Sequence, residues 1–347
     1  GAGARDTENR PNLLRILFQN YFAKKNILLI ILPIILLLIL LNINQNKRYI
    51  RQSLIFGALA EIQIISSNDK KANQAFDKCF KELERLENNL SIFREGSEVY
   101  KINHRTSPQI KVTQELYDLL KYSCDISEKT NNAFDITVYP LIELWKKSEK
   151  ENNLPSDSEI IEIKKQVGYK NIEFLDNNII NFKNNIKIDL GGIAAGYGID
   201  KIVQILYNNN IKNFLINIGG DIFASGHDEF GHEWRIGVQD PASRGHGVTV
   251  LRTRGSVIKT FDIHNRAIVT SGDYEKYFEI NGKKYSHIID PRTGRPAEGS
   301  LSITILAPTT IYADAISTAV SVMGKNEAER FLKDKKEIES YLVFGNG

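Results

Sequence analysis

The chain has 347 residues, of which 42% are hydrophobic and 25% are charged, and its formal net charge is +3. These values are ordinary for globular proteins, and the length allows one large domain or two smaller ones. The small net charge, with no arginine-rich run and no nucleic-acid motif, argues against nucleic-acid binding. The two cysteines, Cys79 and Cys124, form no CxxC motif; they could pair, but two semi-buried helical thiols are the favoured interpretation.

The most hydrophobic segment lies near the N-terminus, at residues 27–43. Its length is close to the ~17–25 residues that a membrane-spanning helix needs. Positive charges before it, such as Arg10 and Arg15, favour a cytoplasmic N-terminus. We therefore expect a cytoplasmic, partly amphipathic segment at 1–26, a single transmembrane signal anchor at 27–43, and an extracytoplasmic domain at 53–347.

Two other interpretations of the hydrophobic segment are less favoured. A cleaved signal peptide should be followed by a site with small residues, and the residues after position 43 do not supply one. A buried core helix would normally carry polar residues on one face, and residues 27–41 contain none.

Hydrophobic periodicity predicts interspersed helices and strands after residue 53. Because these elements show no regular βαβ count, we expect an α+β fold. The predicted helices cover residues 73–90, 116–129, 156–167, 194–208 and 311–323. The predicted strands cover residues 56–65, 172–175, 179–182, 186–190 and 213–218, and residues 234–305 are expected to be mostly strands and turns.

Two predicted strands end in a pair of glycines beside an acidic residue, in IDLGGIAAG at 188–196 and in NIGGDI at 217–222. Glycine lets the backbone approach a ligand closely, and a helix N-terminus favours phosphate. Taken alone, such a loop is better explained as a plain turn in which an acid such as Asp189 acts as a cap. Two of them in one chain strengthen the case for a pyrophosphate ligand.

Asp314 and Thr318 lie four residues apart and so share one face of the predicted helix 311–323. A carboxylate and a hydroxyl among alanines form a small oxygen-lined site of the kind that Mg²⁺ prefers. The alternative is that Asp314 caps the helix and Thr318 bonds back to a carbonyl oxygen.

The densest cluster of polar groups is YSHIIDPRTG at residues 285–294. His287 is the side chain best suited to move a proton near neutral pH. Asp290 could orient its ring and Thr293 could supply a donor, although a histidine that is simply hydrogen-bonded on a strand is the alternative. A second polar run, TSGDY, lies just upstream at 270–274.

Two further positions could contact a flat ring or its substituents. Phe93 follows Ser91 closely and offers a stacking surface, or else a core aromatic after a helix. Asp135 and Thr137 project to the same side if their segment is extended.

Taken in chain order, these segments resemble those of the ApbE family of FAD:protein FMN transferases. The resemblance spans residues 56–345, and the pair SHIIDPRTG and TSGDY is highly specific. The other matching runs are LSIFREGSEVYKIN, FDITVYPLIELW, IDLGGIAAGYGID, NIGGDI, WRIGVQDP and ADAISTAVSVMG.

The resemblance implies an α+β fold with a T-fold-like portion, and an enzyme that binds FAD and Mg²⁺. Such enzymes transfer FMN to a Thr or Ser hydroxyl of an acceptor protein and release AMP. The implied acceptors are subunits of membrane redox complexes or other extracytoplasmic flavoproteins, and the implied location is the bacterial inner (cytoplasmic) membrane with the catalytic domain outside the cytoplasm.

The resemblance also assigns roles to residues. His287 matches the catalytic base. Gly192, through its carbonyl, and the side chains of Asp314 and Thr318 match the metal ligands. The FAD-binding positions are Phe93, Asp135, Asp189, Thr270, Ser271, Gly272, Asp273, Ile288, Asp290 and Thr293.

Three positions depart from the family pattern. Ala195 stands where a lysine is usual, Phe93 where a tyrosine is frequent, and Phe56-Gly57-Ala58 where Met-Gly-Thr is usual. The lost lysine removes a cation expected near the diphosphate. Two alternatives stay open beside FMN transfer. One is hydrolysis of FAD to FMN and AMP, the same chemistry with water as the nucleophile, and the other is a non-catalytic flavin-binding protein, which the loss of the lysine would favour.

Overall fold

The structure of the chain is a computed structural model that describes residues 33, 46–241, 248–250, 256–272 and 277–345. The predicted cytoplasmic segment 1–26 lies outside these ranges, and so does the predicted anchor at 27–43 apart from Pro33. Within the described ranges, no helix is long and apolar enough to cross a membrane. The chain divides into two compact units, Gly1–Lys47 and Arg48–Gly347, and the second contains the elements that surround the candidate site.

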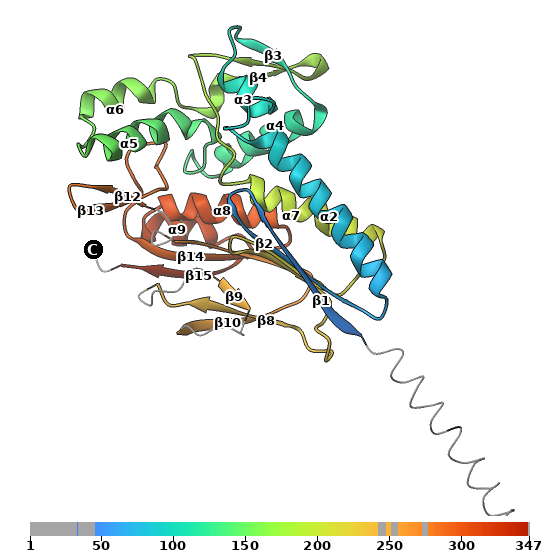
Figure 1. The fold of residues 1–347 in the computed structure, drawn as a ribbon. Helices are drawn as coiled ribbons and strands as arrows, with labels where there is room; N and C mark the ends of the chain where they lie inside the picture. Colours follow the sequence, from blue (N-terminus) through green and yellow to red (C-terminus); the bar gives the residue numbers. More distant parts are fainter. Residues whose placement is uncertain (1–32, 34–45, 242–247, 251–255, 273–276, 346–347) are drawn as a thin grey trace, which may run out of the picture. The chain divides into compact units, whose positions relative to one another are not determined.

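A seven-stranded sheet lies at the centre of the second unit (Figure 1). Every neighbouring pair whose register is described runs antiparallel. In spatial order, the strands are β1 (Lys47–Ile55), β2 (Ala58–Ser66), β6 (Phe214–Ile218), β7 (Asp221–Ser225), β11 (Arg266–Gly272), β14 (Ser300–Ala307) and β15 (Glu339–Phe344).

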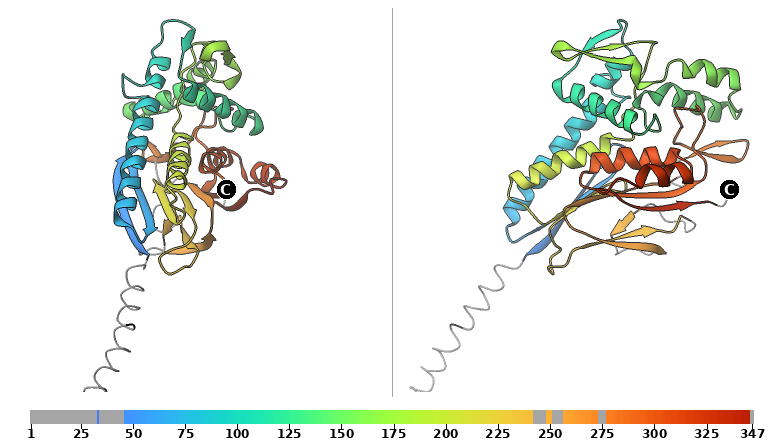
Figure 2. Two further views of the ribbon diagram at one scale, coloured as in Figure 1. Left: turned by 90° about the vertical axis from the view of Figure 1, so that its right-hand side faces the viewer. Right: turned by 180° about the vertical axis from the view of Figure 1, so that it is seen from behind.

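Side chains alternate between the two faces of this sheet, and each face has its own hydrophobic core. Ile216 and Val269 belong to the core shared with the helices, whereas their neighbours Leu215 and Ile268 belong to a second cluster around Trp234. Figures 1 and 2 show helices on one face and a small sheet on the other. The helices are α2 (Asp69–Leu90), α7 (Ala194–Asn208), α8 (Thr310–Val322) and α9 (Lys325–Leu332), and the small sheet is β10 (Val257–Ile263), β8 (Trp234–Gln239) and β9 (Val248–Val250).

A smaller lobe follows α2 in the chain and lies at the top of Figure 1, above α7 and α8. Its helix α5 packs against a hairpin of β12 (Tyr277–Ile280) and β13 (Lys283–Ser286), where the rings of Trp145 and Phe278 stack with centroids 6.4 Å apart. The lobe contains α3 (Glu98–Asn103), α4 (Gln114–Lys129), α5 (Tyr139–Glu151), α6 (Asp157–Lys164), the strands β3 (Gln109–Lys111), β5 (Ile179–Phe182) and β4 (Ile172–Leu175), and 3-10 turns at Ile136–Val138, Tyr169–Asn171 and Asp176–Asn178.

The predicted α+β class is confirmed, and all five predicted helices are present as α2, α4, α6, α7 and α8. The strand predicted at 56–65 begins later, at Ala58, because Phe56 and Gly57 form a tight turn with φ of 54° and 71°. This two-residue turn joins β1 to β2. Helices α3, α5 and α9 and strands β1, β3, β7 and β15 were not predicted.

The strand predicted at 186–190 is wrong, although the segment has the expected alternation of buried apolar residues. Its backbone is paired mainly with side chains, and the Asp189 amide donates to the Ile136 carbonyl at 2.7 Å, so no described strand pairs with it. The side-chain amide of Asn103 donates to the Ile188 carbonyl and accepts from the Ile188 amide, both at 2.8 Å, and Arg105 donates to the Ile186 carbonyl at 2.6 Å. These bonds satisfy the buried backbone groups without a sheet.

The two cysteines lie in α2 and α4, where both are buried and not bonded to each other. Burial raises the pKa of Cys79 to about 12. Burial also raises the pKa of Cys124, and the nearby Asp135 acts in the same direction. The interpretation as helical thiols is therefore confirmed.

Helices α7 and α8 cap each other. Asp200 of α7 accepts hydrogen bonds from the amides of Thr310 (2.8 Å) and Ile311 (2.9 Å), at the start of α8. In return, Asp314 of α8 accepts a hydrogen bond from the amide of Gly196, in the first turn of α7, at 3.1 Å. Each carboxylate thus satisfies amides that a helix start leaves without an intrahelical partner.

Replacing Gly196 with alanine tests this contact. A Cβ atom there would lie 2.7 Å from the Thr310 carbonyl oxygen and 2.9 Å from the Ile311 Cα, and neither backbone atom can rotate away. Alanine favours a helix over glycine by ~1 kcal/mol, but we expect overpacking to outweigh this and to destabilise the protein by about 1–3 kcal/mol in urea unfolding. Gly96→Ala is the control, because its Cβ would meet nothing within 4 Å. Equal stability of Gly196→Ala and the unmodified protein would contradict the packing.

Candidate functional site

A cavity of about 900 Å³ lies beside the first turn of α7. This volume is in the range of small-molecule and cofactor sites. The β1–β2 turn, the loop after α2, the glycine turn before α7, the end of β11, the segment after β13 and α8 all contribute to its walls. The predicted site residues that line it are Phe93, Asp135, Asp189, Gly192, Thr270, Ser271, Gly272, His287, Ile288, Asp314 and Thr318.

Three predicted site residues are not among the described residues of the cavity wall. Asp273 lies outside the described ranges. Asp290 is buried and its carboxylate accepts hydrogen bonds from the Arg292 side chain at 3.0 and 3.2 Å, so it stabilises its own turn. Thr293 is exposed, and its hydroxyl accepts a hydrogen bond from the Arg295 amide at 3.2 Å.

The three residues predicted to bind metal come together at the first turn of α7. The position of Asp314 is fixed by its hydrogen bond to the Gly196 amide. Thr318 lies one helical turn further along α8, and a Cβ atom on Gly192 would lie only 3.1 Å from its hydroxyl oxygen. The absence of a side chain at Gly192 thus leaves room for the close approach of the turn to α8. From β11, Ser271 supports the same helix through a 2.8 Å hydrogen bond between its hydroxyl and that of Ser317.

The chemistry of these donors fits a hard cation. The carboxylate of Asp314, the hydroxyl of Thr318 and the backbone carbonyl of Gly192 would all offer oxygen atoms to a cation. The described residues contain no group of three or more His, Cys, Asp or Glu side chains that could hold a metal. A cation here would therefore take further ligands from water or from a bound phosphate, which is usual for Mg²⁺ and unusual for Zn²⁺.

Burial controls the charge of Asp314. Burial raises the pKa of its carboxyl group above the usual range, and the nearby negative charge of Asp200 raises it further. The hydrogen bond from the Gly196 amide acts in the opposite direction. A cation beside such a carboxylate favours its charged form.

His287 lies on the cavity wall directly after β13, and it is half-buried. The next residue, Ile288, also lines the cavity, and its amide is 3.2 Å from the hydroxyl oxygen of Ser286. The structure therefore brings an imidazole and the Asp314 site to the walls of one cavity, although their residues are far apart in the sequence.

Asp135 and Asp189 line the cavity but also organise its walls. The carboxylate of Asp135 accepts hydrogen bonds from the amides of Thr137 (2.8 Å) and Tyr169 (2.9 Å), and burial raises its pKa. The carboxylate of Asp189 accepts a hydrogen bond from the Gly191 amide at 2.7 Å, which shapes the glycine turn.

Positive charge reaches the cavity from residues that the sequence analysis did not single out as ligands. Ala195 lines the wall without a charge, whereas Lys146 of α5 and Arg94 lie on the wall elsewhere. The Lys146 ammonium lies 5.9 Å from the centre of the Phe93 ring, and Phe93 itself is 74% exposed. Lys146 was missed because α5 was not predicted, so nothing indicated which way its side chain points.

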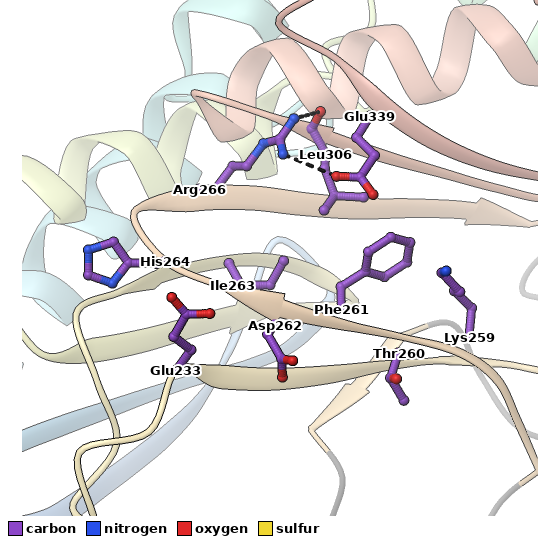
Figure 3. Close-up of a pocket in the computed structure, with 10 residues that line it drawn as sticks. All are labelled: Glu233, Lys259, Thr260, Phe261, Asp262, Ile263, His264, Arg266, Leu306 and Glu339. Atoms are coloured by element: carbon purple, nitrogen blue, oxygen red, sulfur yellow. Dashed lines mark hydrogen bonds and ion pairs between the residues drawn. The ribbon is translucent and has the colours of Figure 1, made fainter.

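A second hollow of about 380 Å³ lies between β10 and the edge of the central sheet (Figure 3). Its charged groups partly neutralise one another: Arg266 forms an ion pair with Glu339 at 3.3 Å and donates to the Leu306 carbonyl at 3.3 Å. None of the residues predicted to bind flavin or metal, or to act as the base, lines this hollow.

Comparison with known proteins gives one consistent result. The sequence profile of the ApbE family matches residues 56–342. The chain is 29% identical over 299 residues to the FAD:protein FMN transferase of Salmonella typhimurium, which covers 84% of this chain and 83% of that protein.

Solved structures of proteins named ApbE have folds similar to that of this chain. The crystal structure of the ApbE protein of Thermotoga maritima is similar with a TM-score of 0.76 and 35% sequence identity, covering 86% of this chain and 94% of that one. The apo form of the flavinyl transferase ApbE of Pseudomonas stutzeri gives a TM-score of 0.75 and 25% identity, covering 87% and 93%. Since profile, relative and fold all point to the same proteins, the chain belongs to the ApbE family.

Proposed function

We propose that this chain is a flavin transferase that moves FMN from FAD to a Thr or Ser hydroxyl of an acceptor protein and releases AMP. The observation that carries the proposal is the convergence of Gly192, Asp314, Thr318 and His287 on one cavity of nucleotide size. Relatives that carry the name FAD:protein FMN transferase support the same activity.

In the proposed reaction, the acceptor hydroxyl oxygen bonds to the phosphorus of the FMN half of FAD. The bond from this phosphorus to the bridging oxygen breaks, and AMP leaves with that electron pair. His287 takes the hydroxyl proton, a role typically worth ~10²–10⁴-fold in rate. Mg²⁺ held by Asp314, Thr318 and the carbonyl of Gly192 would supply positive charge that offsets the charge of the diphosphate.

Hydrolysis of FAD to FMN and AMP is the second candidate, since water could replace the acceptor hydroxyl in the same cavity. The exposure of Phe93 on the cavity wall favours hydrolysis, because it leaves this part of the cavity open to water. A purely flavin-binding role is less favoured, because binding alone has no need of an imidazole on the cavity wall.

We further propose that residues 27–43 anchor the domain in the bacterial inner (cytoplasmic) membrane, with the catalytic domain outside the cytoplasm. The support is the hydrophobicity of this segment and the positive charge before it. The acceptors would then be subunits of membrane redox complexes or other extracytoplasmic flavoproteins.

Replacing His287 with alanine should abolish FMN transfer while FAD still binds, because the change removes the base and leaves the other cavity walls in place. The assay incubates enzyme, FAD, Mg²⁺ and a threonine-bearing acceptor, and measures the intact mass of the acceptor and the release of AMP. His264→Ala, in the second hollow, is the matched control and should transfer normally. An undiminished rate in His287→Ala would remove this residue from the mechanism. AMP release without a mass gain on any acceptor would favour hydrolysis.

Replacing Asp314 with asparagine should raise the Mg²⁺ concentration needed for half-maximal transfer by about 10-fold or more, since loss of a carboxylate ligand should cost at least as much as loss of a supporting group. The measurement is a Mg²⁺ titration of the transfer rate. Asp262→Asn, at an exposed ion pair with Arg235, is the control. A titration curve that coincides with that of the unmodified protein would contradict the metal assignment.

The anchor predicts that the chain stays with membranes after an alkaline carbonate wash, and that N-terminal sequencing of the extracted protein finds residues 27–43 retained. A variant that lacks residues 1–45 should be recovered without detergent. Release of the unmodified chain by carbonate, or a mature N-terminus after residue 43, would disprove the anchor.

A further inference from the structure

The segment that carries His287 continues into a closed loop at residues 288–297. The Ala297 amide donates to the Ile288 carbonyl and the Asp290 amide donates to the Arg295 carbonyl, both at 2.8 Å, which makes the two ends of the loop antiparallel. His287 directly precedes this loop, so the orientation of its backbone depends on where the loop is held.

Helices α5 and α6 hold the tip of the loop. The indole nitrogen of Trp145 donates a buried hydrogen bond to the Gly294 carbonyl at 3.0 Å. Gly294 has a φ of 76°, and a Cβ atom there would lie 2.6 Å from Ile160 of α6, so only glycine allows this approach. Lys164 of α6 donates a hydrogen bond to the Arg292 carbonyl.

The same indole also holds the strands that lead to His287. The ring of Tyr285, two residues before the histidine, lies 5.7 Å from the Trp145 ring, and Phe278 stacks on it at 6.4 Å. The Glu279 amide donates to the side chain of Glu149 on α5 at 2.9 Å. Trp145 thus contacts the chain on both sides of His287, and is itself only 2% exposed.

We propose that Trp145 is a positioning residue that sets the place of the His287 imidazole in the cavity. Its indole ring fixes the strand before the histidine by packing, and its N–H group fixes the loop after it. This inference rests on the proposed function for the role of His287, but the geometry that it describes can be measured without turnover.

The chain provides a matched control for this role. Trp234, one of the chain's two tryptophans, is also 2% exposed and also donates its indole N–H group to a carbonyl oxygen, that of Ser225, at 2.8 Å. It belongs to the cluster on the opposite face of the central sheet and does not line the cavity. Replacing either tryptophan with phenylalanine removes one buried hydrogen bond and keeps an aromatic ring.

The experiment compares Trp145→Phe with Trp234→Phe. We expect similar losses in the urea midpoint, but a fall in kcat of about 10–100-fold only in Trp145→Phe, because small misplacement of a catalytic group has costs of this order. KM for FAD should stay within about twofold, as expected when an interaction needed only for the chemical step is lost. The limb of the pH–rate profile that reports the base should shift only in Trp145→Phe.

A second measurement separates this inference from the proposed function. The ring resonances of His287, identified by their loss in His287→Ala, are followed by NMR through a pH titration. They should shift or broaden in Trp145→Phe and match the unmodified protein in Trp234→Phe, whether or not FMN is transferred. If Trp145→Phe does not fold, Lys164→Met removes a second anchor of the loop and should produce the same changes at smaller size.

Unchanged His287 resonances together with equal kcat values in the two tryptophan variants would overturn the positioning role. Failure of the unmodified protein to transfer FMN to any acceptor would instead count against the proposed function, and the resonances would still decide the role of Trp145.

Discussion

The contact between α7 and α8 at Gly196 is the constraint on which the candidate site depends. Because Gly196 has no side chain, α8 can approach closely enough for Asp314 to accept a hydrogen bond from the first turn of α7. Asp200 closes the arrangement by binding the start of α8. The two helices therefore fix a buried carboxylate next to a glycine turn, and Thr318 follows from the helical repeat. The hydrogen bonds at the starts of α7 and α8 therefore determine where the oxygen atoms of Asp314 and Thr318 lie.

The imidazole reaches the same cavity by an independent route. His287 follows a hairpin that packs on α5, and the loop after it is tied to both α5 and α6. The proposed metal donors belong to the core of the domain, whereas the proposed base is held by the smaller lobe. A shift between these two parts would change the distance between His287 and Asp314 without altering either group, so the packing of α5 against the hairpin matters to the geometry of the candidate site as much as the cavity walls do.

The sequence predicted which residues lie together in the candidate site best where local spacing decides their placement. The four-residue interval of Asp314 and Thr318, and glycines next to a helix start, need no tertiary information. Prediction from the sequence failed where a residue far away in the chain determines the local structure. Residues 186–190 alternate like a strand, but the Asn103 side chain takes the place of a neighbouring strand. Helix α5 was hidden because Pro140 resembles a turn signal, although proline is tolerated in a first helical turn, where its missing N–H group has no partner to lose. Asp290 binds Arg292, two residues away, and the sequence alone did not favour this partner over the ring of His287.

The two buried cysteines have a consequence for the redox environment in which the folded domain can persist. Both thiols are packed inside separate helices, and burial holds their pKa values far above neutrality, so almost no thiolate is available for oxidation or disulfide exchange in the native state. The native state of the described domain therefore needs neither an oxidant nor a reductant to be maintained. An enzyme of this construction can act in an oxidising compartment without the help of disulfide-forming catalysts, and its thiols become reactive only when α2 or α4 opens.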